Sequence, residues 1–327
     1  MLRPFTHFAC FGLLSALLTR PSLAYPAKFN DDPCIKVAGK TFVDPAHALD
    51  CMKSFPFRED LRQNVLSVVS RVFDFYTFEI FYPNSPAPFQ ESTTDIRGQI
   101  SRIYSAQYEV SAFPSPSNAL PTYGLFPSET DYDFNLDLYD TTNQMNDGHT
   151  RTSCYCHVVL LPPLILLSGW YPSCYFTFNN ILPTPLVLLG DDVFIIPNSV
   201  EVLEQFGRGF TRYFEQEKYF DWKRLAGAQV IEIGGLNALD YIDQIAKTVS
   251  GNYLDHNIRV NSVVSSYRIV GSRFSQRLGD AASELFLKQT SLDMTLIPKG
   301  SASNTPETVT VPFVAGFIGN DFTDGPS

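Results

Sequence analysis

Apolar residues recur at every third or fourth position in several stretches of the first half of the chain, a spacing that predicts amphipathic helices. Asp44 followed by Pro45 has the form of an N-cap with proline at the first helical position, so we expect a helix through about Lys53. A second predicted helix begins near Asp60, and its expected inward side chains share this spacing: Leu61, Val65, Val68, Val72 and Phe75. Prolines then break the chain before a further helical stretch at 96–108.

A fourth helix is predicted to begin at Ser128-x-x-Asp131, which has the form of a capping box, and to end at Gly148. One face carries its inward residues: Phe134, Leu138, Thr141 and Met145. The other face carries most of its carboxylates: Asp131, Asp133, Asp137 and Asp140. Charges on one helix face usually contact water, so we expect these carboxylates to be solvated. The helix leads into residues 146–150, Asn-Asp-Gly-His-Thr.

Beyond residue 180 the pattern changes to short apolar runs, which are typical of strands. The predicted strands are 186–189, 193–196, 229–233 and 309–313. Gly190-Asp191-Asp192 predicts a hairpin between the first two, and Gly234-Gly235 predicts a turn after the third. Residues 239–249 predict a helix with these side chains inward: Tyr241, Ile242, Ile245 and Val249. We therefore expect an α+β protein, in which a helical domain precedes a small module of strand pairs and one helix.

The N-terminus has the organisation of a signal peptide. The short basic start Met1-Leu2-Arg3 precedes an apolar run from Phe8 to Leu18, which is too short to span a bilayer. Ser22-Leu23-Ala24 supplies small residues for cleavage after Ala24. We predict that residues 1–24 are removed and that the protein enters the secretory pathway, without membrane attachment after cleavage. A short N-terminal anchor is the alternative.

Five of the six cysteines remain after that cleavage, and an oxidising compartment favours disulfides. Cys34 and Cys51 are close in sequence and flank the start of the first helix, so we expect them to pair. The other three are Cys154, Cys156 and Cys174. The cluster Cys154-Tyr155-Cys156-His157 has the residue types of a metal site, but no second pair of ligands follows it. We therefore predict neither a metal nor another cofactor.

The composition is that of a folded protein, with 44% apolar and 18% charged residues. The 24 basic and 34 acidic side chains give a formal net charge of −10, and no run of Lys and Arg occurs. A phosphate backbone needs clustered positive charge, so nucleic acid is excluded as a partner.

One stretch differs from its surroundings. Ser153-Cys154-Tyr155 recurs as Ser173-Cys174-Tyr175, and the apolar run Val158 to Trp170 lies between the two copies. We interpret residues 153–178 as an apolar insert that arises from a retained intron or an error in the gene model. A genuine buried strand or hydrophobic loop is the alternative.

Four features taken together, in this order and spacing, resemble the fungal members of the S41 serine peptidase family. These peptidases are relatives of the tail-specific proteases and carry a PDZ domain like that of the chlamydial protease CPAF. The matching features are Pro33-Cys34 with Cys51, the residues 146–150, the module at 229–246, and Val311-Pro312-Phe313. Excising the apolar insert improves the resemblance.

The resemblance implies a role for one residue in particular. His149 would be the general base that deprotonates a serine nucleophile, whereas a surface or capping histidine is the alternative. The family's serine and its acidic partner belong to a domain after the PDZ-like module, and the chain is expected to stop before that domain. Neither Gly-x-Ser-x-Gly nor Ser-x-x-Lys occurs in the sequence. A base without its nucleophile cannot perform acyl transfer.

Three functions follow as hypotheses. The first is a secreted S41-type peptidase that processes a precursor peptide, by resemblance in the biosynthesis of ribosomal peptide mycotoxins of the ustiloxin and phomopsin kind. The second is a catalytically inactive, truncated relative that only binds peptides, by adding them as a strand to the PDZ-like module. The third is a secreted structural or effector-like protein unrelated to peptidases. The partner expected from the first two is a peptide or precursor protein.

The expected domain organisation combines the patterns with the resemblance. It consists of a signal peptide at 1–24, an N-terminal helical domain at 25–152, the apolar insert at 153–178, a PDZ-like module at 179–308, and the start of a truncated protease domain at 309–327.

Overall fold

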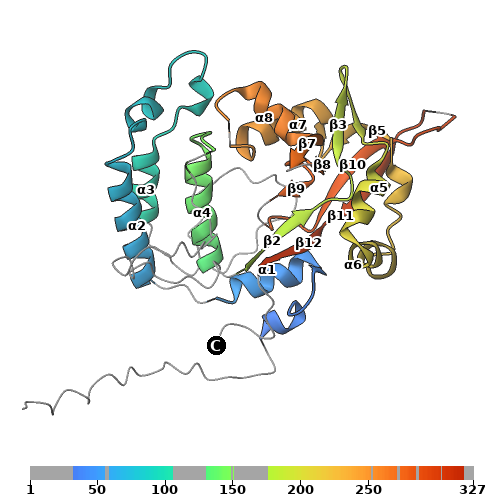
Figure 1. Ribbon diagram of the computed structural model, residues 1–327, viewed down its shortest axis with the longest axis horizontal. Coiled ribbons are helices and arrows are strands. Elements are labelled where there is room, and N and C mark those ends of the chain that lie inside the picture. The colour runs from blue at the N-terminus through green and yellow to red at the C-terminus, as the bar shows by residue number, and fades with distance from the viewer. Residues whose placement is uncertain are drawn as a thin grey trace, which may run out of the picture.

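The computed structural model describes residues 32–55, 59–105, 130–148, 150, 176–251, 253–270, 273–284, 287–302 and 304–319. A layer of helices lies on one side of the molecule, and two antiparallel sheets with their own helices lie on the other (Figure 1). The predicted α+β class is confirmed. None of the helices in this part of the chain is long and apolar enough to cross a membrane.

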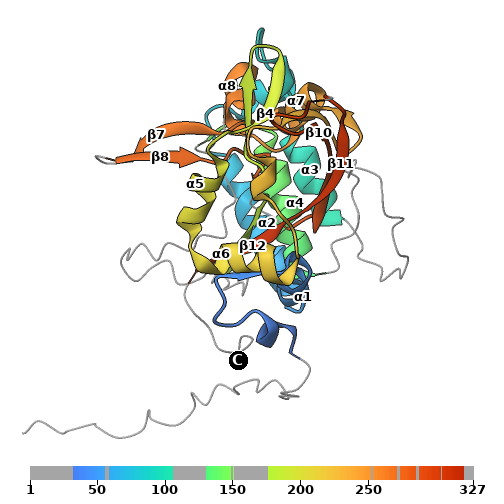
Figure 2. The same ribbon diagram turned by 90° about the vertical axis from the view of Figure 1, so that its right-hand side faces the viewer.

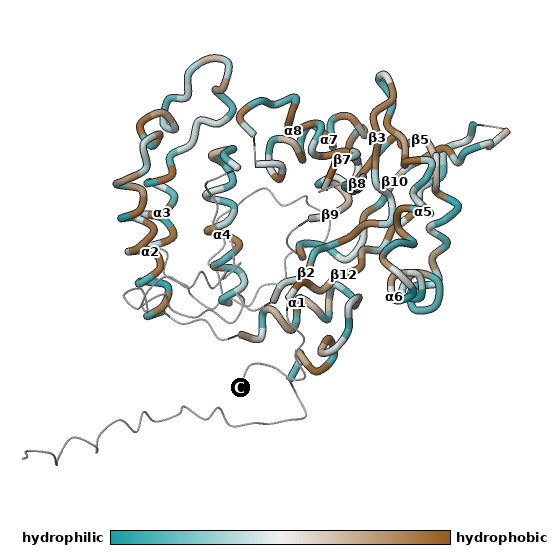
Figure 3. The backbone as a smooth tube through the Cα atoms, in the orientation of Figure 1, coloured by the Kyte–Doolittle hydropathy of each residue, from teal (hydrophilic) through white to brown (hydrophobic). Residues whose placement is uncertain are grey.

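Three helices form the helical layer: α2 (Glu59–Phe73), α3 (Ile96–Ser105) and α4 (Asp131–Asn143). Two 3-10 turns, η2 (Glu79–Asn84) and η3 (Gln90–Ser92), lie in the connection between α2 and α3. Hydrophobic and hydrophilic stretches alternate along α2 and α3, as expected of helices that bury one side (Figure 3). The buried residues of this layer are Leu66, Phe73, Tyr82, Ile96, Ile100, Ile103, Phe134, Leu138 and Met145.

The predicted inward face of α2 is wrong for its second half. Val68 and Val72 are 51% and 60% exposed, and Phe75, just beyond the helix, is 88% exposed. Leu66 and Phe73 are buried instead, so the helix is rotated relative to the expected orientation. The cause lies in the partner elements. Arg62 is buried on the same side as Leu66, because its guanidinium donates to the carbonyl oxygen of Ile103 in α3.

The larger sheet has the strand order β11-β10-β5-β4-β3, and a short strand β6 pairs with β5. Its strands are β3 (Leu186–Leu189), β4 (Asp192–Ile195), β5 (Gln229–Ile233), β6 (Leu236–Asn237), β10 (Ser291–Ile297) and β11 (Glu307–Pro312). The predicted hairpin β3–β4, the strand β5 and its Gly-Gly turn are confirmed. Gly234 and Gly235 both have positive φ, at 58° and 82°, which explains the glycine pair.

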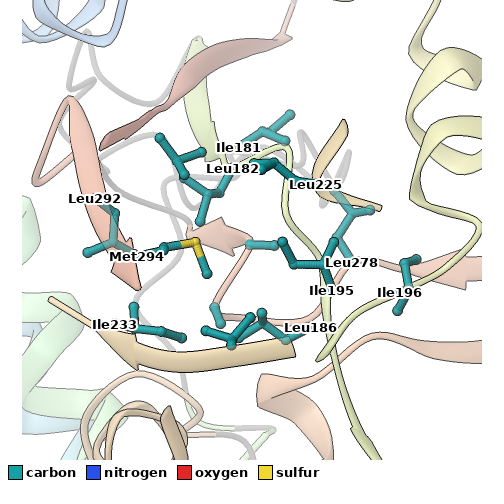
Figure 4. Close-up of a cluster of buried hydrophobic side chains, with 14 of the residues drawn as sticks. Ile181, Leu182, Leu186, Ile195, Ile196, Leu225, Ile233, Leu278, Leu292 and Met294 are labelled. Carbon is teal, nitrogen blue, oxygen red and sulfur yellow. The ribbon is translucent and has the colours of Figure 1, made fainter. Parts of the chain in front are cut away.

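Helices cover this sheet and complete its core. The helix α7 (Ala238–Thr248) confirms the predicted helix at 239–249, and Tyr241, Ile242 and Ile245 are buried as expected. The other helices are α5 (Ser199–Leu203), α6 (Arg208–Arg212) and α8 (His256–Val263), none of which the pattern predicted. Figure 4 shows part of the core, where Met294 of β10 lies among Leu292, Ile233 and Leu186.

The smaller sheet has the order β1-β12-β2-β9 and joins the two ends of the described chain. Its strands are β1 (Phe42–Val43), β2 (Phe176–Ile181), β9 (Ser283–Glu284) and β12 (Val314–Gly319). The sequence pattern did not predict β12. A separate hairpin of β7 (Ser266–Val270) and β8 (Arg273–Arg277) projects from the body of the molecule (Figure 2).

These pairings bear on the expected boundaries. The segment from residue 309, which we assigned to the start of a further domain, lies in the two sheets as far as Gly319. Residues 176–178, at the end of the expected insert, begin β2 and pair with β12. The rest of the insert and residues 1–24 lie outside the described residues.

The helix α1 (Pro45–Lys53) closes the end of the smaller sheet. Asp44 caps it by accepting a hydrogen bond from the amide of Ala46 at 2.8 Å, and Pro45 occupies its first position, as predicted. The expected pairing of Cys34 with Cys51 is also confirmed, with the two Sγ atoms 2.03 Å apart. This disulfide ties α1 to the 3-10 turn η1 (Pro33–Lys36), and both cysteines are buried.

Candidate active-site loop

The residues next to the candidate base in sequence follow α4. The helix ends at Asn143 rather than continuing to Gly148, and the left-handed residue of its C-terminus is Asn146, with φ of 53°. Asparagine tolerates this conformation better than other residues with a side chain, which explains why no glycine is needed there. The buried side chain of Met145 fixes the start of the loop in the core of the helical layer. His149 itself lies outside the described residues, between Gly148 and Thr150, which the structure does describe.

The start of α4 also differs from the prediction. The N-cap is Thr130, whose hydroxyl accepts from the amide of Asp133 at 3.3 Å and donates to its carboxylate at 2.8 Å. The capping residue is therefore two positions later than the expected Ser128, which lies outside the described residues. A threonine and a carboxylate three positions on satisfy the same need for a cap.

The carboxylate of Asp147 holds the loop from one side. Its Oδ2 accepts hydrogen bonds from the hydroxyl of Tyr76 at 2.8 Å and from that of Thr150 at 2.7 Å. The amide of Thr150 also donates to the carbonyl oxygen of Asp147 at 3.2 Å. These contacts fix Asp147 and Thr150, the described residues on either side of Gly148 and the candidate base, relative to each other.

Two tyrosines support this carboxylate. The rings of Tyr76 and Tyr82 stack with their centroids 6.0 Å apart, and their hydroxyl oxygens lie 3.2 Å apart. Burial raises the pKa of Tyr76, and the neighbouring charge of Asp147 acts in the same direction. Burial likewise raises the pKa of Tyr82. Both phenols therefore keep their protons at neutral pH, and Tyr76 remains a hydrogen-bond donor to the loop.

The turn η3 holds the loop from a second side. The amide nitrogen Nδ2 of Asn146 donates to Ser92 Oγ at 2.9 Å, and both side chains are buried. Just before the loop, Gln144 Oε1 accepts from Thr94 Oγ1 at 3.1 Å. The serine hydroxyl is fully buried and occupied in this contact, so Ser92 is a structural partner of the loop and no candidate nucleophile.

Sequence reasoning missed these supports. Tyr76 and Asp147 are 71 positions apart, and Ser92 and Asn146 are 54 apart. No local spacing connects them. The one available signal was the polar composition of residues 146–150, which identified the loop but not its partners.

The carboxylates of α4 are buried or half-buried, whereas we predicted a fully solvated face. Asp131 is 2% exposed, and Asp133, Asp137 and Asp140 are half-buried. Lysines from other elements pack against this face: Lys53 of α1 lies 2.9 Å from Asp133, and Lys288 lies 3.6 Å from Asp140. The helix pattern could not show that α1 and the segment around residue 288 cover this side.

Asp137 has an unusual charge state as a result. Burial, together with the neighbouring carboxylates of Asp140 and Asp133, raises its pKa to about 7. Burial also raises the pKa of Asp140, although Lys288 acts against this. Asp137 therefore exchanges its proton near neutral pH.

Metal binding finds no support in the described residues, where no group of three His, Cys, Asp or Glu side chains has the arrangement of a metal site. The cluster at 154–157 lies outside them.

An open depression of about 600 Å³ lies beside the disulfide, lined in part by Lys36, Asp50 and Lys53. Its lining residues belong to η1, α1 and the residues directly beside them.

No protein-family model matches this sequence, and no curated protein matches it. The likeness to the S41 peptidases therefore remains a prediction from the sequence.

The raised pKa of Asp137 predicts a pH-dependent stability. Between its ordinary pKa of 3.8 and about 7, the folded protein binds more protons at this site than the unfolded chain. The free energy of unfolding therefore falls as the pH rises through this range. We expect the difference in free energy of unfolding between Asp137→Asn and the wild type to shift by about 2 kcal/mol in favour of the variant as the pH rises from 4 to 7. This figure allows for solvent screening of a half-buried group. Urea unfolding across this range measures it. Asp191→Asn, in the exposed β3–β4 turn, is the control, and parallel profiles for all three proteins would contradict the prediction.

The hydrogen bond from Tyr76 to Asp147 predicts that removing this one hydroxyl lowers the stability of the protein and loosens the loop. Tyr76→Phe keeps the stacked ring but removes the donor to the loop, and we expect a loss of about 1 kcal/mol in the free energy of unfolding. The amide hydrogen exchange rates of residues 146–150 should also increase in this variant. Tyr104→Phe, which removes the hydroxyl of an exposed tyrosine, is the matched control. Equal exchange rates in the two variants would show that Tyr76 does not hold the loop.

Proposed function

We propose that this chain is a secreted peptide-binding protein of the S41 serine peptidase type, and that it takes an extended peptide as an additional strand on β11. The natural ligand would be a precursor peptide, of the kind that the resemblance implies. The single observation that carries the proposal is the outer edge of β11, which presents backbone hydrogen-bonding groups that no strand of the described residues uses.

The register of β11 determines which groups these are. The amide of Phe313 donates to the carbonyl oxygen of Thr290 at 2.9 Å, so Phe313 and Thr290 lie opposite each other as a hydrogen-bonded pair. Hydrogen-bonded and non-hydrogen-bonded pairs alternate along an antiparallel ladder, so every second residue of β11 before Phe313 bonds to β10. These residues are Val311, Val309 and Glu307, which lie opposite Leu292, Met294 and Leu296. The backbone groups of Thr308, Thr310 and Pro312 point away from β10.

Two further observations support this assignment. Pro312 occupies an outward position, where its missing N–H costs no bond in the ladder. On the other side of β10, the carbonyl oxygen of Asp293 accepts from the amide of Gly234, directly after β5, at 2.8 Å, as the same alternation requires.

The edge strand at the other end of the sheet is less open. Ile196 donates through its amide to the carbonyl oxygen of Pro185 at 2.9 Å, so Leu186 and Leu188 are the outward residues of β3. The carbonyl oxygen of Leu186 already accepts from the amide of Ser265 at 2.7 Å. A peptide that added to β3 would compete with this internal contact, which favours β11.

Peptidase activity is the second candidate function, and the loop at 146–150 supports it. Contacts from Tyr76, Thr150 and Ser92 fix the residues around His149, as a general base requires. A nucleophile is not identified in the sequence, so binding is the function that the chain's own residues support best.

Proline substitutions test the binding proposal. A peptide selected from a random decapeptide library with the wild-type protein serves as the probe, and fluorescence anisotropy gives its Kd. Thr308→Pro removes an outward N–H and leaves the bonds to β10 intact, so we expect a folded protein whose Kd rises about tenfold or more. Val309→Pro is the contrasting variant. It removes an N–H that bonds to β10, and its free energy of unfolding should fall.

Leu188→Pro is the matched control at the other edge. It removes an outward N–H of β3, and we expect it to leave the Kd within about twofold, since the proposed peptide site involves no group of β3. A Kd that rises in Leu188→Pro and not in Thr308→Pro would move the peptide to β3 and contradict our assignment.

A serine-reactive fluorophosphonate probe separates binding from catalysis. The sequence holds no serine in a recognised nucleophile motif, so we expect no labelling, and we expect His149→Ala to leave the Kd of the selected peptide unchanged. Labelling of one serine that disappears in His149→Ala would instead establish the peptidase.

A further inference from the structure

A cluster of charged side chains connects the helical layer to α7 and α8. His256, at the start of α8, lies between two carboxylates from different elements. Its Nδ1 is 3.0 Å from Glu91 Oε2 in η3, and its Nε2 is 2.9 Å from Asp243 Oδ1 in α7. The connection between α2 and α3, which contains η3, lies beside α8 (Figure 1).

The two contacts require a charged imidazole. A neutral imidazole carries one N–H, and its other nitrogen presents a lone pair. One of the two carboxylates would then face that lone pair. Only the protonated ring donates to Glu91 and Asp243 at the same time, so both contacts exist together only while His256 is charged.

The other charged groups around the ring have contacts of their own, and one of them, Arg259, also has its Nη2 3.4 Å from His256 Nδ1. Arg259 is 1% exposed, and its guanidinium donates to Glu91, to the carbonyl oxygen of Ala246 at 2.9 Å and to that of Tyr253 at 2.8 Å. Lys247 bonds to Asp243 at 2.6 Å. Asp255 caps α8 by accepting from the amide of Ile258 at 3.1 Å. The cluster is electrically balanced with His256 protonated and carries one excess negative charge without that proton.

The charged cluster and the candidate loop contact consecutive residues of η3. Glu91 contacts His256, and the next residue, Ser92, accepts the hydrogen bond of Asn146. Nearby, Asn143 Nδ2 at the end of α4 donates to the carbonyl oxygen of Val249 at 3.0 Å. The position of η3 relative to α8 therefore determines where the residues before His149 are held.

We propose that His256 is a proton-dependent positioning residue, which ties η3 to α7 while it is charged and thereby holds Asn146, through Ser92, in place. When the ring loses its proton, one of the two carboxylate contacts is lost, and the residues that η3 holds lose their fixed position. The inference goes beyond peptide binding at β11, and its test does not depend on that function.

The experiment is amide hydrogen exchange of the full chain, read by mass spectrometry at pH 5 and pH 8 and corrected for the intrinsic rates. In the wild type, we expect the protection of the peptide that contains residues 144–150 to fall about three- to tenfold between these pH values. Protection of β10 should stay constant. In His256→Gln, protection of the loop should be low at both pH values, and His47→Gln, which replaces an exposed histidine of α1, should behave like the wild type.

Asp243→Asn gives a second measurement that keeps the histidine. With Glu91 as its one carboxylate partner, a neutral ring can supply the single N–H required, so the pH dependence should become smaller while the loop stays protected. Equal pH dependence in the wild type and His256→Gln would overturn the proposal. So would an undiminished dependence in Asp243→Asn.

Discussion

The guanidinium of Arg259 is buried, and a buried cation needs partners for all of its donors. Its backbone partners come from the end of α7 and from residues 253 and 254, and its one carboxylate partner, Glu91, comes from the helical layer. The arrangement of α7, α8 and η3 is therefore linked through a single side chain. The loop that carries the candidate base depends on η3 in turn, through Ser92 and Asn146. A charge that must be satisfied in the interior thus connects the sheet module to the candidate site.

Local patterns predicted those elements whose partners lie nearby in the sequence. The hairpin β3–β4, the strand β5 with its glycine turn, and α7 follow from apolar spacing and turn chemistry within a few residues. The cap of α1 and the disulfide belong to the same group. Each of these features is decided by residues that the pattern itself contains.

Features that depend on distant partners were not predictable in this way. The strand β12 is formed between β1 and β2, and β1 lies more than 250 residues earlier in the chain. The orientation of α2 depends on Arg62 bonding to α3, and the burial of the α4 carboxylates depends on lysines of other segments. At the candidate site, the sequence identified the residues 146–150 but not the tyrosine and serine that hold them. Tertiary contacts override helix amphipathicity when a polar side chain finds a buried partner.

Pro312 limits how long a strand can grow on the edge of β11. Only Thr308 and Thr310 offer both an outward N–H and an outward carbonyl there, so an added strand has few backbone bonds to form. Few bonds give a short residence time, because affinity differences between related complexes arise mainly in the dissociation rate. A short edge that ends in proline also resists pairing with the same edge of another molecule, which protects a protein at high local concentration from aggregation. If a peptide adds to this edge as we propose, the edge would favour short-lived complexes over permanent capture.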